Sequence, residues 1–172
     1  MHWRRCDYRI ESLNLTIEGL EKSILELDKK IEEIEWYDGI WFLEEVEPII
    51  GLSFIALQNY INSSIYDRFE TLENQYKKYK FGELVNNTKR TEIELIIGIA
   101  NYFKHRDDEN DLRKGTSTVL LDCGLKINKD IDITESPIIK GLELLTEKWS
   151  LSDLITIVDK WRENLWIEKK KH

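Results

Sequence analysis

Apolar residues recur in alternating steps of three and four along the first 35 residues of the chain. This heptad pattern predicts one long N-terminal helix over residues 1–35, with isoleucine at every a position and mostly leucine at d. Such a seam suits either a parallel two-stranded coiled coil or packing against later helices of the same chain. We favour packing within the chain, because the flanking e and g positions offer only one clearly attractive charge pair. The seam consists of Ile10, Leu13, Ile17, Leu20, Ile24, Leu27, Ile31 and Ile34.

A second apolar stretch follows this helix. Aromatic and aliphatic residues surround Asp38-Gly39 within residues 36–46, which predicts a turn and then a short buried helix. Pro48 suits the first turn of another helix, because its missing N–H would be unpaired there anyway. Residues 49–69 are apolar around much of their circumference, so they predict the central core helix. Its amide Gln58 either forms a hydrogen bond between helices or lies on an exposed face.

Helix start and stop signals divide the rest of the chain. Thr91-x-x-Glu94 has the form of a capping box, so a helix should begin there and end near residues 101–108. Thr116 to Gly124 has the signals of another short helix. Ser136-Pro137 opens the next one, and Ser150 or Ser152 caps a final helix.

These elements predict an all-α fold, a single-domain bundle of five to six helices. Residues 125–133 alternate in polarity, but we interpret them as a loop. With 172 residues, 41% hydrophobic and 34% charged, the composition is that of a globular chain large enough to bury a core. We expect one domain, 1–172, with the long helix at 1–35, core helices at 36–108 and C-terminal helices at 116–170.

Several classes of function lack a signal in the sequence. There is no apolar stretch of membrane-spanning length and no secretory leader, and Cys6 and Cys123 are too isolated for a disulfide framework, so we expect a cytoplasmic protein with reduced thiols. There is also no Gly-rich phosphate loop, no zinc-ligand spacing and no nucleophile elbow. We therefore expect neither a metal nor a cofactor.

Charge divides unevenly along the chain, whose net charge is −8. Residues 11–47 hold twelve acidic and three basic side chains, which makes the long helix a candidate surface for a protein partner. Residues 76–106 hold seven basic and three acidic side chains with aromatic residues between them, a pattern that can hold phosphates and stack bases. The alternative, which we favour, is a solvated loop. The seven basic residues are Lys77, Lys78, Lys80, Lys89, Arg90, Lys104 and Arg106.

One pair of residues could carry chemistry. Asn101 and His105 are four positions apart and so share a helix face, with Lys104 and Arg106 beside the histidine. The imidazole could act as a general acid or base, the amide could orient a ribose or phosphate oxygen, and the cations could stabilise a phosphate in RNA cleavage. The structural alternative, which we favour, is a histidine that interacts with the last carbonyls of its helix.

The segment Ala100-Asn101-Tyr102-Phe103-Lys104-His105 resembles the Asn-x-x-x-His portion of the HEPN motif. HEPN domains are a helical ribonuclease and nucleotide-binding family of bacterial toxin–antitoxin and antiphage systems. The resemblance implies a metal-independent endoribonuclease with His105 and Asn101 as catalytic residues, and a homodimer whose motif helices face each other across a cleft. Such a pairing would suit Gly98, which lies about one turn before Asn101 on the same helix face. Catalytic members carry an arginine separated from the histidine by four to six residues, whereas positions 98–100 here are Gly, Ile and Ala.

Two hypotheses for the function follow. The first is a HEPN-like protein of a bacterial defence or toxin–antitoxin system that binds or cleaves RNA, with the basic segment guiding phosphates towards His105. The second is a non-catalytic helical interaction protein, such as an antitoxin, an immunity protein or an accessory subunit, that binds a partner through the acidic first helix or an aromatic patch.

Overall fold

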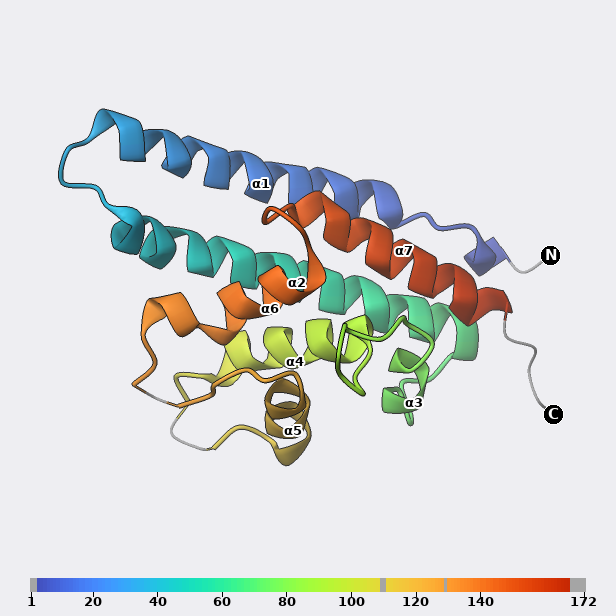
Figure 1. The fold of residues 1–172 in the computed structure, drawn as a ribbon. Coiled ribbons are helices and arrows are strands. Elements are labelled where there is room, and N and C mark those ends of the chain that lie inside the picture. The colour runs from blue at the N-terminus through green and yellow to red at the C-terminus, as the bar shows by residue number, and fades with distance from the viewer. Residues whose placement is uncertain (1–2, 109–110, 129, 168–172) are drawn as a thin grey trace.

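The computed structural model describes residues 3–108, 111–128 and 130–167 and confirms the all-α fold. Within these residues there is no β-strand, only an isolated β-bridge between Leu84 and Thr91. The described part of the chain forms six α-helices longer than a single turn and one single-turn helix, α3. The elements, shown in Figure 1, are η1 Trp3–Arg5, α1 Ile10–Glu33, α2 Gly39–Phe69, α3 Tyr76–Tyr79, α4 Glu92–His105, α5 Lys114–Asp122, η2 Ile133–Glu135, α6 Pro137–Leu145 and α7 Leu151–Ile167.

The heptad seam of α1 packs inside the chain from Ile10 to Leu27, whereas Ile31 near the end of the helix is 41% exposed. Leu13 and Ile17 are buried, and Ile10, Leu20, Ile24 and Leu27 are partly buried against the same core. Figure 1 shows α1 lying along α2 and α7, which are its neighbours in space. The N-terminus of α7 is tied to α1 by Glu21, whose carboxylate accepts hydrogen bonds from the backbone nitrogens of Leu151 (2.9 Å) and Ser152 (3.4 Å).

The prediction of two separate helices around Pro48 is wrong. Residues 39–69 form the single helix α2, and Pro48 lies in its interior on an exposed face. A proline there removes the backbone hydrogen bond to residue 44, but Val46 and Ile50 are fully buried on either side of it and hold the helix against the core. Asp38 caps the start of α2 by accepting hydrogen bonds from the backbone nitrogens of Ile40 and Trp41.

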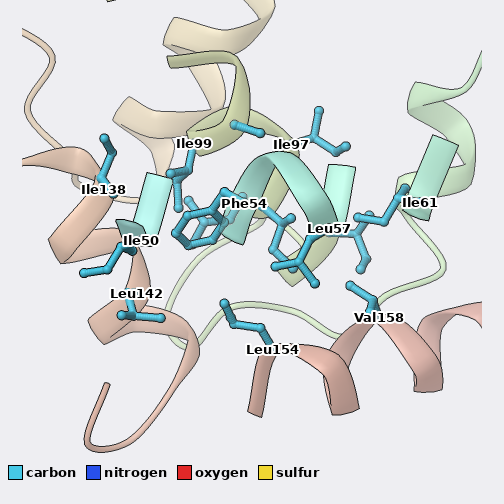
Figure 2. Close-up of a cluster of buried hydrophobic side chains, with 14 of the residues drawn as sticks. Ile50, Phe54, Leu57, Ile61, Ile97, Ile99, Ile138, Leu142, Leu154 and Val158 are labelled. Atoms are coloured by element: carbon cyan, nitrogen blue, oxygen red, sulfur yellow. The ribbon is translucent and has the colours of Figure 1, made fainter. Parts of the chain in front are cut away.

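The core lies around the middle of α2. Figure 2 shows Phe54 and Leu57 of α2 among side chains from α4, α6 and α7. At Gly51 the helices α2 and α4 come so close that a Cβ atom would lie 2.5 Å from the ring of Phe103. α2 therefore positions the end of α4, where the candidate site lies.

Most of the capping predictions are confirmed. Thr91 and Glu94 form both hydrogen bonds of the capping box at the start of α4. Ser136 caps α6, with Pro137 in its first turn, and Ser150 accepts a hydrogen bond from the backbone nitrogen of Asp153. The start of α5 differs, because it begins at Lys114 rather than at Thr116, which is buried within the helix. Of the described residues in 125–133, only Ile133 belongs to a helix, because it begins η2, so the loop prediction is confirmed except at its last residue.

Candidate functional site

Asn101 and His105 follow each other on the last two turns of α4, but they lie in different surroundings. The Asn101 Oδ1 atom accepts a hydrogen bond of 2.9 Å from Nε2 of Gln58, a buried residue of α2. His105 is exposed, and its Nδ1 lies 2.8 Å from Oδ2 of Asp108. The two side chains expected to act together are therefore each engaged by a different neighbour.

Gln58 also binds the lysine beside the histidine. The Lys104 Nζ donates a hydrogen bond of 2.6 Å to Oε1 of Gln58, so one buried amide connects Lys104 with Asn101. Burial lowers the pKa of the Lys104 ammonium group, and the nearby Arg113 guanidinium lowers it further. The buried Gln58 amide thus has hydrogen-bond partners on the neighbouring helix α4. Of the two options that the sequence allowed for Gln58, a hydrogen bond between helices is the correct one.

The Arg106 side chain links the end of α4 to α2 through an ion pair. Its Nη1 donates a 2.6 Å hydrogen bond to Oε2 of Glu47, which is buried. The other carboxylate oxygen of Glu47 accepts a hydrogen bond from the hydroxyl of Ser136 at the start of α6. Three helices therefore meet at this ion pair, and the cation expected beside His105 already has an anionic partner.

His105 and Arg106 lie in the wall of a cleft of about 770 Å³ between the ends of α2 and α4 and the segments after α5. Tyr102 and several aliphatic side chains form the apolar part of its wall. The carboxylates that line it outnumber the cations, and Asn101 is not among the described residues that line it. A phosphate in this cleft would face mostly like charge. The lining carboxylates are Glu44, Glu47, Asp107, Asp108 and Asp111.

The remaining basic residues lie at the other end of α4. α3 carries Lys77 and Lys78, and it is followed by Lys80. The Tyr79 carbonyl at the end of α3 accepts a hydrogen bond from Thr91 at the N-terminus of α4, so α3 lies roughly 20 Å along the α4 axis from His105 (Figure 1). The basic segment that is continuous in sequence is thus divided in space.

Individual cations of this segment also have partners within the chain. The Arg90 guanidinium binds Glu94 at 3.0 Å and Asp122 at 2.7 Å. The Lys78 Nζ lies 4.0 Å from the centre of the Phe69 ring. Lys77, Lys80 and Lys89 are exposed.

We expected the pairing of motif helices that the HEPN resemblance implies to suit Gly98. In the structure Gly98 is buried beneath α5, and a Cβ atom added there would lie 3.2 Å from Val119. Helix α5 therefore covers Gly98, while His105 at the end of the same helix face is exposed.

A second candidate site lies at the turn between α1 and α2, at one end of the molecule (Figure 1). Trp36, Ile40 and Trp41 expose 67%, 57% and 55% of their surface there. The two indole rings are in edge-to-face contact, with centroids 6.1 Å apart. We call these three residues the aromatic tip. They correct the sequence prediction that residues 36–46 form a turn followed by a buried helix.

The tip is held by polar contacts beneath it. Tyr37 is buried, and its hydroxyl donates a 2.6 Å hydrogen bond to Oε2 of Glu45, which also binds Lys30 at 3.1 Å. Burial and the hydrogen bond to Glu45 raise the pKa of Tyr37 to about 12, while this bond and Lys30 lower the pKa of Glu45. The Tyr37–Glu45–Lys30 contacts and the Asp38 cap fix the turn, so the exposed rings are preorganised.

The surroundings of the tip are strongly acidic. We call residues 25–45 the acidic arm; it holds eight exposed carboxylates and two lysines, a local charge of −6. Both lysines form ion pairs within the arm, Lys29 with Glu26 and Lys30 with Glu45. Six of the eight carboxylates are therefore paired with neither lysine, and Glu35, Asp38 and Glu44 among them lie within three residues of Trp36 or Trp41 in the sequence. The eight are Glu26, Asp28, Glu32, Glu33, Glu35, Asp38, Glu44 and Glu45.

Comparison with known proteins gives no relative: no family model, no curated protein and no solved structure matches the chain. Within the described residues, no helix combines the length and the apolar character needed to cross a membrane.

Proposed function

We propose that this protein is a non-catalytic helical interaction protein that binds a basic protein partner through its aromatic tip. The observation that carries the proposal is the exposure of Trp36, Ile40 and Trp41 together on a rigid turn. Large exposed aromatic groups in contact with one another are costly to leave in water and are typical anchors of protein interfaces.

The chemistry of the partner follows from the surface around the tip. An apolar centre with a charged rim is the usual anatomy of an interface. Here the rim carries the acidic arm, so a partner that offers an apolar groove edged by lysine or arginine would gain both contact and charge complementarity. This protein could then serve as an antitoxin, an immunity protein or an accessory subunit, or as any other adaptor that binds one basic protein.

Binding or cleavage of RNA is the second candidate. It is favoured by His105, which is exposed in the wall of a cleft large enough for a nucleotide, and by the resemblance of residues 100–105 to the HEPN motif. The amide of Asn101 is engaged by Gln58, Arg106 is paired with Glu47, and five carboxylates line the cleft. These contacts weigh against phosphate binding there, and so they favour the interaction protein.

Comparative affinity capture tests the proposal. The wild-type protein and a Trp36→Ser/Trp41→Ser variant are immobilised, exposed to a lysate of the native host, and the retained proteins are quantified by mass spectrometry. A matched control is Tyr76→Ser, which removes an aromatic ring that is 56% exposed but lies in α3. We expect at least one basic protein to be retained by the wild type and the control and lost by the double variant. Equal recovery on all three would overturn the proposal.

The location is proposed on separate grounds. Cys6 is exposed and Cys123 is buried, and both are free thiols. Free thiols are usual in the reducing cytosol, so we place the protein there.

A further inference from the structure

The exposed face of α2 is unusual for this chain because it lacks charge. Residues 48–66 contain no Asp, Glu, Lys, Arg or His in a protein that is 34% charged. Leu52 and Tyr66 expose 50% and 49% of their surface, and Asn59 between them is exposed. Ile55 and Ala56 of the same face are half-buried. Burial of apolar side chains inside the molecule does not explain why the outward side is uncharged as well.

Small, uncharged residues of helix α1 lie beside this face of α2. A hollow of about 140 Å³ lies between Ser12 and Thr16 of α1 and Ala56 and Asn59 of α2. Arg9 at its end is the one charged residue among the described residues of its lining, and its guanidinium is paired with the buried Asp67. Gly19 and Ser23 continue the α1 stripe at helical spacing, and all four α1 residues are exposed. Small side chains make this border flat and allow another backbone to approach closely. We call residues 52, 55, 56, 59, 62, 63 and 66 of α2 the α2 face.

Charge indicates what covers this face. The chain carries a net charge of −8, and the acidic arm repels the same arm of another copy. Two copies can therefore meet with least repulsion on a surface that has no charge, whereas a strongly charged partner gains nothing from it. We propose that the α2 face binds the α2 face of a second copy in an antiparallel, two-fold symmetric dimer.

The spacing of the face fits this symmetry. In an isologous contact residue i of one copy meets residue j of the other and residue j meets residue i, so only a residue on the axis meets its own counterpart. With the axis at Asn59, Leu52 and Tyr66 lie seven residues on either side, and Ile55 and Ser63 lie four on either side. An antiparallel pair in this register places Leu52 against Tyr66 of the second copy, and Asn59 against Asn59. Residues 52–66 span roughly 20 Å of helix, enough for several turns of contact.

Mass measurement over a concentration series tests the dimer. Light scattering coupled to size-exclusion chromatography should give twice the chain mass of 20.5 kDa at high concentration. Leu52→Glu and Tyr66→Lys should each give the monomer mass, because each places unpaired charge in the contact. Leu121→Glu is the control: Leu121 is 56% exposed on α5, which contributes no residue to the α2 face or to its α1 border, and its variant should stay dimeric. Circular dichroism confirms that each variant is folded.

The register is tested by combining the two changes. When Leu52→Glu and Tyr66→Lys are made in the same chain, the new carboxylate at position 52 of each copy faces the new ammonium group at position 66 of the other copy. The double variant should therefore regain the dimer mass. A monomeric wild type, or single variants that remain dimeric, would overturn the proposal. A folded double variant that stays monomeric would overturn the antiparallel register. The proposal is independent of the aromatic tip, which none of these substitutions touches.

Discussion

Gln58 donates a hydrogen bond to the side-chain oxygen of Asn101 across the contact between α2 and α4. Gln58 is buried, and its own oxygen accepts from Lys104. The amide that the HEPN resemblance assigns to catalysis is therefore part of a structural polar chain. A structural role and a catalytic role for Asn101 predict different consequences of removing it.

We expect Asn101→Ala to lower the free energy of unfolding by about 1–3 kcal/mol, because it leaves the buried Gln58 amide without this acceptor. Urea denaturation followed by circular dichroism measures the change. Asn86→Ala, which removes an exposed loop amide, should change stability by less than about 0.5 kcal/mol. Equal stability of the two variants would show that the Gln58–Asn101 bond contributes little.

The two candidate functions differ in their dependence on His105. We expect neither the wild type nor His105→Ala to cleave tRNA or total cellular RNA, because the cleft is lined by carboxylates and Arg106 is paired with Glu47. Gel analysis of RNA incubated with each purified protein tests this. Cleavage by the wild type that disappears in His105→Ala would support the ribonuclease instead. Cleavage that survives the substitution would indicate a contaminating nuclease.

Glu21 belongs to the fold rather than to the acidic interaction surface. Its carboxylate accepts hydrogen bonds from two backbone nitrogens at the start of α7, where it also interacts favourably with the helix dipole. Glu21→Ala should lower the free energy of unfolding by about 1–2 kcal/mol. Glu18→Ala, one turn earlier and exposed, should have an effect below about 0.5 kcal/mol. If both substitutions are equally mild in thermal and urea unfolding, the capping role is wrong.

Glu45 makes the stability of the turn beneath the aromatic tip depend on pH. Its pKa is lowered in the folded protein by the hydrogen bond from Tyr37 and by Lys30. The ionised form therefore stabilises the fold above the unfolded-state pKa, and this contribution is lost as pH falls through the lowered folded-state pKa. Glu45→Gln should destabilise the protein at pH 7 and have a smaller effect near pH 3. Urea unfolding of both proteins at the two pH values measures this, and a cost that does not change with pH would contradict it.

Local patterns in the sequence were sufficient to predict much of the fold. The capping box at Thr91-Glu94 and the Ser136-Pro137 start depend on neighbouring residues, so the signal and its partners lie in one short segment. The α1 seam was predictable because its period is set by the helix itself. The interior position of Pro48 was not, because it depends on how firmly the core holds the rest of α2.

The candidate sites depended on long-range contacts that no local pattern reveals. Asn101 meets Gln58, 43 positions earlier, and Arg90 meets Asp122, 32 positions later. The aromatic residues near Gly39 predicted burial because such residues are usually inside, and a sequence does not show which side of a turn faces the core. The acidic character of the arm was visible in the sequence, but the exposure of Trp36 and Trp41 within it was not.

The most direct test of the interaction protein is the affinity of its captured partner for single tip variants. Once that basic protein is purified, biolayer interferometry gives its dissociation constant for the wild type, Trp36→Ala, Trp41→Ala and the control Tyr76→Ala. We predict a loss of about 10-fold or more for each tryptophan variant, as expected when an anchor side chain is removed, and no change for the control. Affinities within about two-fold of the wild type for both tryptophan variants would contradict the account.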